Sequence, residues 1–136
     1  MKEITVPAIL DNIATVTNFI NSELEAVNCS EYERIQIDVV VDEIFGNIAK
    51  YAYGQEEGTA TIRVDVSDDL SAISITFIDY GIPFNPLNNM APDTTLKSKE
   101  RKIGGLGIFM TREIMNDMRY EYKYESNQLT IRKVIR

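Results

Sequence analysis

The sequence predicts an α+β fold: a two-layer α/β sandwich whose mixed, mostly antiparallel sheet is covered on one face by helices. Two long segments within the first 54 residues repeat apolar side chains at steps of three or four, which is typical of amphipathic helices. Two later pairs of segments alternate apolar and polar residues, which is typical of strands. Strands that follow each other directly suggest a mixed, mostly antiparallel sheet, with the helices gathered on one face.

The chain begins with a predicted strand at residues 2–6 (KEITV), followed by a helix. Pro7 fits the opening of that helix, since proline is tolerated in a first helical turn. One apolar stripe then continues with helical spacing, through Ile9, Ile13, Val16, Ile20, Leu24 and Val27.

A second helix is predicted from about Glu31 to Gly54. Ser30 and Glu33 match a capping box, in which each side chain bonds the other residue's backbone N–H. The stretch IQIDVVVDEIF also alternates at its start and resembles a strand, but the cap, the length and Gly54 favour a helix. The helix would bury Ile37, Val41, Ile44 and Ile48, with Val40, Glu43, Asn47 and Tyr51 along one border.

The second half of the chain begins with strands at 59–66 and 70–79, joined by a turn at Asp68–Asp69. Residues 80–104 lack periodicity, and long loops in small domains are usually lids or binding loops. A helix at 108–118 and a hairpin complete the chain. The hairpin pairs 118–124 with 129–134 and turns at Ser126–Asn127.

Composition indicates one domain over residues 1–136 and excludes several kinds of site. The single cysteine, Cys29, excludes an internal disulfide, and the absence of histidine excludes a Ser-His-Asp triad and a His-bound zinc. A net charge of −7 disfavours direct nucleic-acid binding. The start, MKEITVPAIL, lacks the apolar core of a signal peptide, and no apolar run approaches the ~18 residues of a membrane span. We therefore expect a cytoplasmic protein without membrane contact.

Glu43 and Asn47 form the first candidate site. Side chains four residues apart lie on the same side of a helix. A carboxylate there can accept a proton, and a carboxamide oxygen can bind a hard cation such as Mg²⁺. The alternative is a solvated polar edge of the helix.

Asp79 and Gly81 form the second candidate, where a strand runs into a turn. The Asp79 carboxylate could accept a hydrogen bond from the amino group of a base, and such a bond is worth roughly 1.5–3 kcal/mol. The alternative is an ordinary Asp-x-Gly turn that ends the strand.

The third candidate is the segment KIGGLG at residues 102–107. Its glycines precede a helix, where backbone N–H groups and the helix dipole bind anions, although a helix cap or a hinge explains them equally well. Four cations precede the glycines and could reach phosphates, Arg101 in a bidentate manner. Solvated loop residues are the alternative for the three lysines, Lys97, Lys99 and Lys102.

In this order the three patterns resemble the histidine-kinase-type ATPase superfamily, or Bergerat fold, and within it the single-domain anti-sigma factor serine/threonine kinases. The matching boxes are Glu43-x-x-x-Asn47, Asp79-x-Gly81-x-Pro-Phe and Gly105-Leu106-Gly107. Thr130 matches a late-strand threonine that these domains carry beside the adenine. Tyr51 departs from the family, since many relatives carry histidine there.

The resemblance implies that the chain binds ATP or ADP with Mg²⁺. Asn47 would bind the metal, Glu43 would be the catalytic base, and Asp79 with Gly81 and Thr130 would hold the adenine. Gly105, Leu106 and Gly107 would close over the phosphates, and Arg101 would contact the γ-phosphate. The implied partners are an anti-sigma-factor antagonist protein, which the kinase phosphorylates, and an RNA polymerase sigma factor, which it sequesters. A homodimer is a further family expectation.

Two other functions remain open at this stage. The chain could be a regulatory module in which bound ATP or ADP switches partner binding without catalysis. It could also be a detached sensor-kinase ATPase domain, although the chain is short and has no pair of dimerisation helices.

Overall fold

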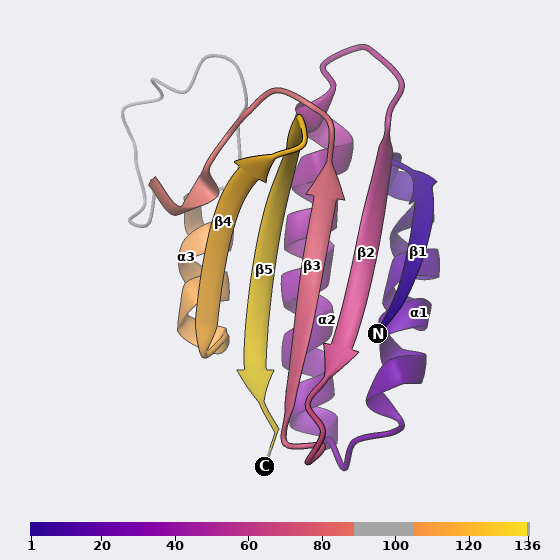
Figure 1. Ribbon diagram of the computed structural model, residues 1–136, viewed down its shortest axis with the longest axis vertical. Helices are drawn as coiled ribbons and strands as arrows, with labels where there is room; N and C mark the ends of the chain where they lie inside the picture. The colour runs from indigo at the N-terminus through magenta and orange to yellow at the C-terminus, as the bar shows by residue number, and fades with distance from the viewer. Residues whose placement is uncertain (89–104, 136) are drawn as a thin grey trace.

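The computed structural model describes residues 1–88 and 105–135, which form a five-stranded sheet covered on one face by helices (Figure 1). The strands are β1 (Lys2–Pro7), β2 (Thr59–Val66), β3 (Ala72–Asp79), β4 (Asp117–Lys123) and β5 (Ser126–Val134). The helices are α1 (Ile13–Leu24), α2 (Glu31–Asn47) and α3 (Gly105–Ile114). Short 3₁₀ turns lie at Leu10–Asn12 and Pro86–Asn88, and a π-helix spans Ile48–Ala52. The predicted α+β class and element order are confirmed.

The sheet has the strand order β1-β2-β3-β5-β4, and all four neighbouring pairs are antiparallel. The sequence predicted a mixed, mostly antiparallel sheet. Strands β3 and β4 run in the same direction, as Figure 1 shows, but β5 folds back from β4 and lies between them. This insertion brings the start of β5 against the end of β3.

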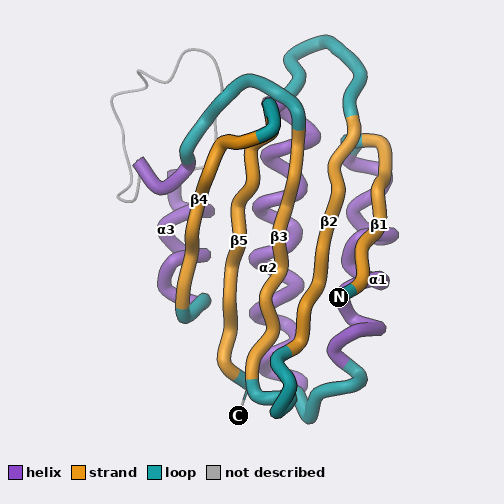
Figure 2. Tube along the Cα trace, viewed as in Figure 1, coloured by secondary structure: helices purple, strands orange, loops and turns teal. Residues whose placement is uncertain are grey.

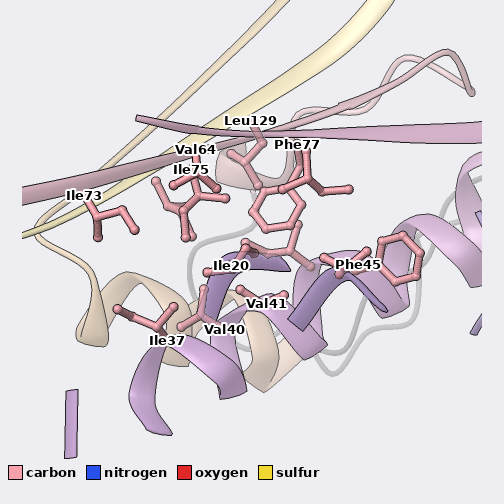
Figure 3. Close-up of a cluster of buried hydrophobic side chains, with 14 of the residues drawn as sticks. Ile20, Ile37, Val40, Val41, Phe45, Val64, Ile73, Ile75, Phe77 and Leu129 are labelled. Atoms are coloured by element: carbon pink, nitrogen blue, oxygen red, sulfur yellow. The ribbon is translucent and has the colours of Figure 1, made fainter. Parts of the chain in front are cut away.

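The helices form a single layer in which α2 contacts both α1 and α3 (Figures 1 and 2). Between the layers lies the core, where side chains of β2, β3 and β5 face those of α1 and α2 (Figure 3). The predicted stripe of α2 is buried: Ile37, Val41, Ile44 and Ile48 are at most 4% exposed. Fully burying one such side chain contributes about 1.5–3 kcal/mol, so this stripe fixes the rotation of α2 against the sheet.

The start of α2 also matches its prediction. The Ser30 hydroxyl accepts from the Glu33 N–H at 3.1 Å, and the Glu33 carboxylate accepts from the Ser30 N–H at 3.1 Å. Together these bonds satisfy two backbone donors that would otherwise lack partners at the helix start.

The start of α1 differs from its prediction. Pro7 is the last residue of β1, which is an edge strand and so tolerates a residue without an N–H. A 3₁₀ turn and the bond from Asn12 Nδ2 to the Pro7 carbonyl, 2.8 Å, delay the helix to Ile13. Ile9 is consequently 50% exposed and is not part of the buried stripe.

The C-terminal elements also begin and end elsewhere than predicted. Helix α3 starts at Gly105 and ends at Ile114, and residues 117 and 118 already belong to β4. The hairpin turns at Tyr124–Glu125, whose φ angles are 53° and 57°, and not at Ser126–Asn127. Serine and asparagine favour turns, but here both are buried at the start of β5.

Candidate functional site

A cavity lies where β3 ends, β5 begins and α2 passes into the π-helix. It encloses about 390 Å³ of space, part of it open to solvent. The walls are mostly apolar, formed by Ile44, Ile48, Phe77, Phe84, Pro86, Ile108 and Leu129. Four polar residues also line it: Asn47, Asp79, Tyr120 and Asn127. A mostly apolar cavity lined by a few polar groups is typical of a small-molecule site.

Asn47 and Glu43 lie together on α2, as their spacing predicts. Asn47 is 7% exposed, and its Nδ2 donates to Glu43 Oε2 at 3.0 Å. The amide oxygen of Asn47 is therefore the end that points away from Glu43. An amide oxygen is a suitable ligand for a hard cation, and Asn47 lines the cavity.

Gly107 of α3 lies directly against Glu43. A Cβ atom at Gly107 would be 2.1 Å from both Glu43 Cδ and Glu43 Oε2. A side chain at this position would therefore displace the Glu43 carboxylate. We call Glu43, Asn47 and Gly107 the Asn47 cluster. Helix α3 begins at Gly105, and Gly107 is its third residue. The first backbone N–H groups of the helix therefore lie beside this cluster. Arg101 and the neighbouring lysines fall outside the described residues.

Asp79 is the buried carboxylate of the cavity, with 2% exposure. Its Oδ1 accepts from the Gly81 N–H at 2.9 Å and from Asn127 Nδ2 at 3.0 Å. Asn127 is 3% exposed and also receives the Tyr120 hydroxyl on its Oδ1. We call Asp79, Tyr120 and Asn127 the Asp79 cluster.

The turn after Asp79 packs closely on the π-helix. A Cβ atom at Gly81 would be 2.1 Å from the carbonyl oxygen of Ala52, and the Ile82 N–H donates to that oxygen at 2.9 Å. The π-helix lies between Asn47 and the turn after Asp79. Such π-helical turns occur often at functional sites. The π-helix connects the two clusters.

Tyr53 adds a second link to the same turn. Its hydroxyl donates to the Thr59 carbonyl at 2.5 Å and accepts from the Tyr80 N–H at 2.8 Å. Burial raises the pKa of the Tyr53 phenol above its ordinary value of 10.0. The phenol therefore stays protonated and keeps both bonds at neutral pH.

Thr130 does not lie with Asp79, and this part of the sequence prediction is corrected. It pairs with Thr76 on the sheet face away from the helices, where the two hydroxyls are 2.9 Å apart. Asn127 is the β5 residue opposite Asp79, and sequence reasoning missed it. The alternation in NQLTIRK carried the signal, since it places Asn127 on the face of the apolar Leu129 and Ile131.

The described residues contain no group of three or more His, Cys, Asp or Glu side chains that could hold a metal. Magnesium usually keeps several waters and is bound through one or two protein oxygens together with substrate phosphates. The single amide oxygen of Asn47 fits that mode of binding. Among the residues that the structure describes, no helix is long and apolar enough to span a membrane.

A protein-family model described as a histidine kinase-like ATPase domain matches residues 6–133. Among solved structures, the RsbU and RsbW domains of Rv1364c from Mycobacterium tuberculosis match with a TM-score of 0.65 at 11% identity. That match covers 99% of this chain, which spans only 33% of the Rv1364c chain.

Two histidine kinases share the fold as well. The catalytic domain of ThkA matches with a TM-score of 0.57 at 14% identity, over 99% of both chains. AdeS of Acinetobacter baumannii matches with a TM-score of 0.54 at 13% identity, over 99% of this chain and 69% of its own. No curated protein matches the chain in sequence. At these identities the structural matches establish the fold alone.

Proposed function

Because the chain belongs to the family of histidine kinase-like ATPase domains, we propose that it binds ATP and ADP and acts as a protein serine/threonine kinase. Its substrate would be an anti-sigma-factor antagonist protein, and it would sequester an RNA polymerase sigma factor. The observation that carries the proposal is one apolar cavity lined by both Asp79 and Asn47. This combination suits a ligand with an apolar ring at one end and a charged, metal-binding group at the other.

In this proposal the adenine ring of the nucleotide occupies the apolar part of the cavity. The walls offer aromatic and aliphatic side chains, including Phe77, Phe84 and Ile108. Asp79 accepts a hydrogen bond from the amino group of adenine, in a setting where the carboxylate is nearly inaccessible to water. A hydrogen bond to a charged group is worth roughly 1.5–3 kcal/mol, which is enough to orient the base.

The phosphates lie toward the Asn47 cluster. The Asn47 amide oxygen would hold Mg²⁺, which would supply neutralisation of phosphate charge. The first N–H groups of α3, at Gly105 to Gly107, add hydrogen bonds and the positive end of a helix dipole. Arg101 is proposed as a further contact to the γ-phosphate.

Glu43 is the proposed base that takes the proton from the acceptor hydroxyl. Its carboxylate accepts a hydrogen bond from Asn47 Nδ2 at 3.0 Å, which holds the proposed catalytic base beside the proposed metal ligand. Phosphoryl transfer depends mainly on positioning and charge neutralisation, with the base adding ~10²–10⁴ in rate.

The sequence resemblance and the RsbW domain in one fold neighbour support the choice of partners. A regulator of a sigma factor works in the cytoplasm, so the proposal includes that location, and a homodimer is part of it. The alternative function is an ATP/ADP-dependent switch without catalysis. One observation favours it: Glu43 Oε2 is engaged by Asn47 and covered by Gly107.

The deciding experiment incubates the protein and its Glu43→Gln variant with Mg-ATP and a candidate antagonist protein. Calorimetry first establishes that both bind ADP. The kinase proposal expects phosphoserine or phosphothreonine on the antagonist, detected by mass spectrometry, and ~10²–10⁴-fold slower transfer in the variant. Nucleotide binding by both proteins without any phosphorylated antagonist would support the switch, and absence of nucleotide binding would exclude both functions.

A further inference from the structure

Asn127 is the buried polar side chain whose role the sequence did not predict. It is the second residue of β5, is 3% exposed, and lies opposite Asp79 in the register of β3 and β5. Burying an amide is costly unless its donors and acceptor all find partners. The partners of Asn127 therefore indicate what the residue is for.

The orientation of the Asn127 amide is fixed by its partners. Its Nδ2 donates to the Ile82 carbonyl oxygen at 3.0 Å, and its Oδ1 accepts from the Phe84 N–H at 3.0 Å. A carbonyl can only accept, and a backbone N–H can only donate. Rotating the amide by 180° would break both bonds. It would place a donor against the Phe84 N–H and an acceptor against the Ile82 carbonyl, so Nδ2 must face Asp79.

The result is a carboxylate held in one orientation. Asp79 Oδ1 receives two N–H donors, from Gly81 and from Asn127, at 2.9 and 3.0 Å. A carboxylate oriented in this way presents hydrogen-bond acceptors to the cavity. Such an edge suits a base with an amino group there and repels one with a carbonyl oxygen.

We propose that Asn127 is a positioning residue that holds the Asp79 carboxylate in one orientation and thereby gives the cavity its preference for a 6-amino purine over a 6-oxo purine. The inference rests on the proposed nucleotide binding and adds the residue that sets base selectivity. Asn127 acts through Asp79, because its own amide is already occupied by Asp79, Ile82, Phe84 and Tyr120.

Asn127→Asp is the informative substitution, because the new side chain has the same shape but replaces the donor Nδ2 with an oxygen. Two carboxyl groups would then lie about 3 Å apart, and such a pair holds one proton between them. The side of the cavity at Asp79 would then offer a hydrogen-bond donor as well as an acceptor. The variant should lose its discrimination between the two kinds of purine.

The test measures the dissociation constants of ADP and IDP by calorimetry, since hypoxanthine differs from adenine only at that edge. The parent should bind ADP roughly 10–100-fold more tightly than IDP, from the value of a hydrogen bond to a charged group. Asn127→Asp should reduce this ratio at least tenfold. Thr130→Val is the control, because Thr130 lies three positions after Asn127 in β5 and on the outer face of the sheet. This variant should leave the ratio unchanged.

A second variant covers the case in which Asn127→Asp does not fold. Tyr120→Phe keeps the ring on the cavity wall and removes only the hydroxyl that donates to Asn127 Oδ1. It should lower the ADP:IDP ratio by roughly threefold, in line with one neutral hydrogen bond.

Three outcomes separate the two proposals. A parent that binds neither nucleotide overturns the proposed function. A parent that binds ADP and IDP equally, or a folded Asn127→Asp variant with the parental ratio, overturns the role of Asn127 and leaves nucleotide binding intact. Where Asn127→Asp does not fold, an unchanged ratio in Tyr120→Phe overturns that role instead.

Discussion

The Asp79 cluster and the Asn47 cluster line one cavity, but they are held in different ways. In the Asp79 cluster, side chains of β3, β4 and β5 bond one another and the turn at residues 81–84. In the Asn47 cluster, one hydrogen bond joins Glu43 to Asn47 within α2, and Gly107 of α3 lies against Glu43 while its carbonyl accepts from Thr111 Oγ1. The hydrogen bonds described for the first cluster join three strands and a turn, whereas those described for the second stay within one helix each. In the proposed function a phosphate and a metal would join the two helices of the second cluster.

This difference matches two different tasks. Base recognition depends on a fixed pattern of donors and acceptors, which must exist before the ligand arrives. Phosphoryl transfer depends on groups that close around the phosphates, and such closure is commonly part of the catalytic cycle. Changes in the Asn47 cluster should therefore alter rate, and changes in the Asp79 cluster should alter affinity and stability.

Gly107→Ala should have the largest effect, and it should be confined to the Asn47 cluster. The added methyl group would lie 2.1 Å from the Glu43 carboxylate, so Glu43 must move. Displacing a catalytic group by about 1 Å can cost ~10²-fold in rate. Phosphoryl transfer to the antagonist should fall by about that factor, while adenosine binding, measured by calorimetry, should stay at the parental value.

Gly46→Ala is the matched control, because it adds the same methyl group to α2 at a point where no described atom lies within 4 Å. It should keep the parental rate and gain up to about 1 kcal/mol of stability from helix propensity. A Gly107→Ala variant with parental phosphoryl transfer would remove the case for Glu43 as the base.

Asp79→Asn should weaken ADP binding roughly 10–100-fold, since an amide is a weaker acceptor for the adenine amino group than a carboxylate. Thermal stabilisation by ADP measures the change directly, and it should shrink by about 1.5–3 kcal/mol at saturating nucleotide. Asp42→Asn, at an exposed position of α2, serves as the control. Equal stabilisation of Asp79→Asn and the parent would mean that Asp79 does not contact the base.

The sequence predicted those features that depend on local chemistry. The capping box at Ser30 and Glu33 marks the start of α2, and the four-residue spacing of Glu43 and Asn47 places them side by side. The alternation in β2 and β3 gives their buried faces correctly. These signals need no knowledge of the rest of the fold.

The features that sequence reasoning missed depend on which strands become neighbours. Asn127 looks like a turn residue until β5 is inserted beside β3, where the register sets it opposite Asp79. The contact of Gly107 with Glu43 depends on how α3 packs against α2, which no spacing encodes. The alternation in β5 already put Thr130 on the sheet face opposite to Leu129, but it did not show which β5 residue lies beside Asp79.

Gly81→Ala tests the link between the two clusters. The new Cβ would lie 2.1 Å from the Ala52 carbonyl oxygen, so the turn and the π-helix must separate. Overpacking of this kind costs about 1–3 kcal/mol, which urea denaturation would measure. Both ADP affinity and phosphoryl transfer should fall. Gly107→Ala, in contrast, should lower mainly the transfer rate, and Asp79→Asn should lower mainly the affinity. Parental stability would show that the turn does not need this close approach.

Tyr53→Phe should have the smallest effect, and it should depend on pH. The variant keeps the ring but loses the bonds to Thr59 and Tyr80, at a cost of about 1 kcal/mol near neutral pH and a Tm lower by a few degrees. The phenol's pKa is raised above 10.0 in the folded protein, so the unfolded chain loses that proton first as pH rises. The contribution of Tyr53 is thus complete below pH 10 and is lost as pH rises through the folded pKa.

The Tm difference between parent and Tyr53→Phe should therefore narrow above about pH 10. Tyr124→Phe, at a side chain that is 84% exposed, controls for the other tyrosines and should track the parent at every pH. A constant Tm difference across this range would show that the Tyr53 hydroxyl does not stabilise the turn after Asp79. A narrowing difference would show that this turn, and the adenine recognition proposed for it, depends on the protonated Tyr53 phenol.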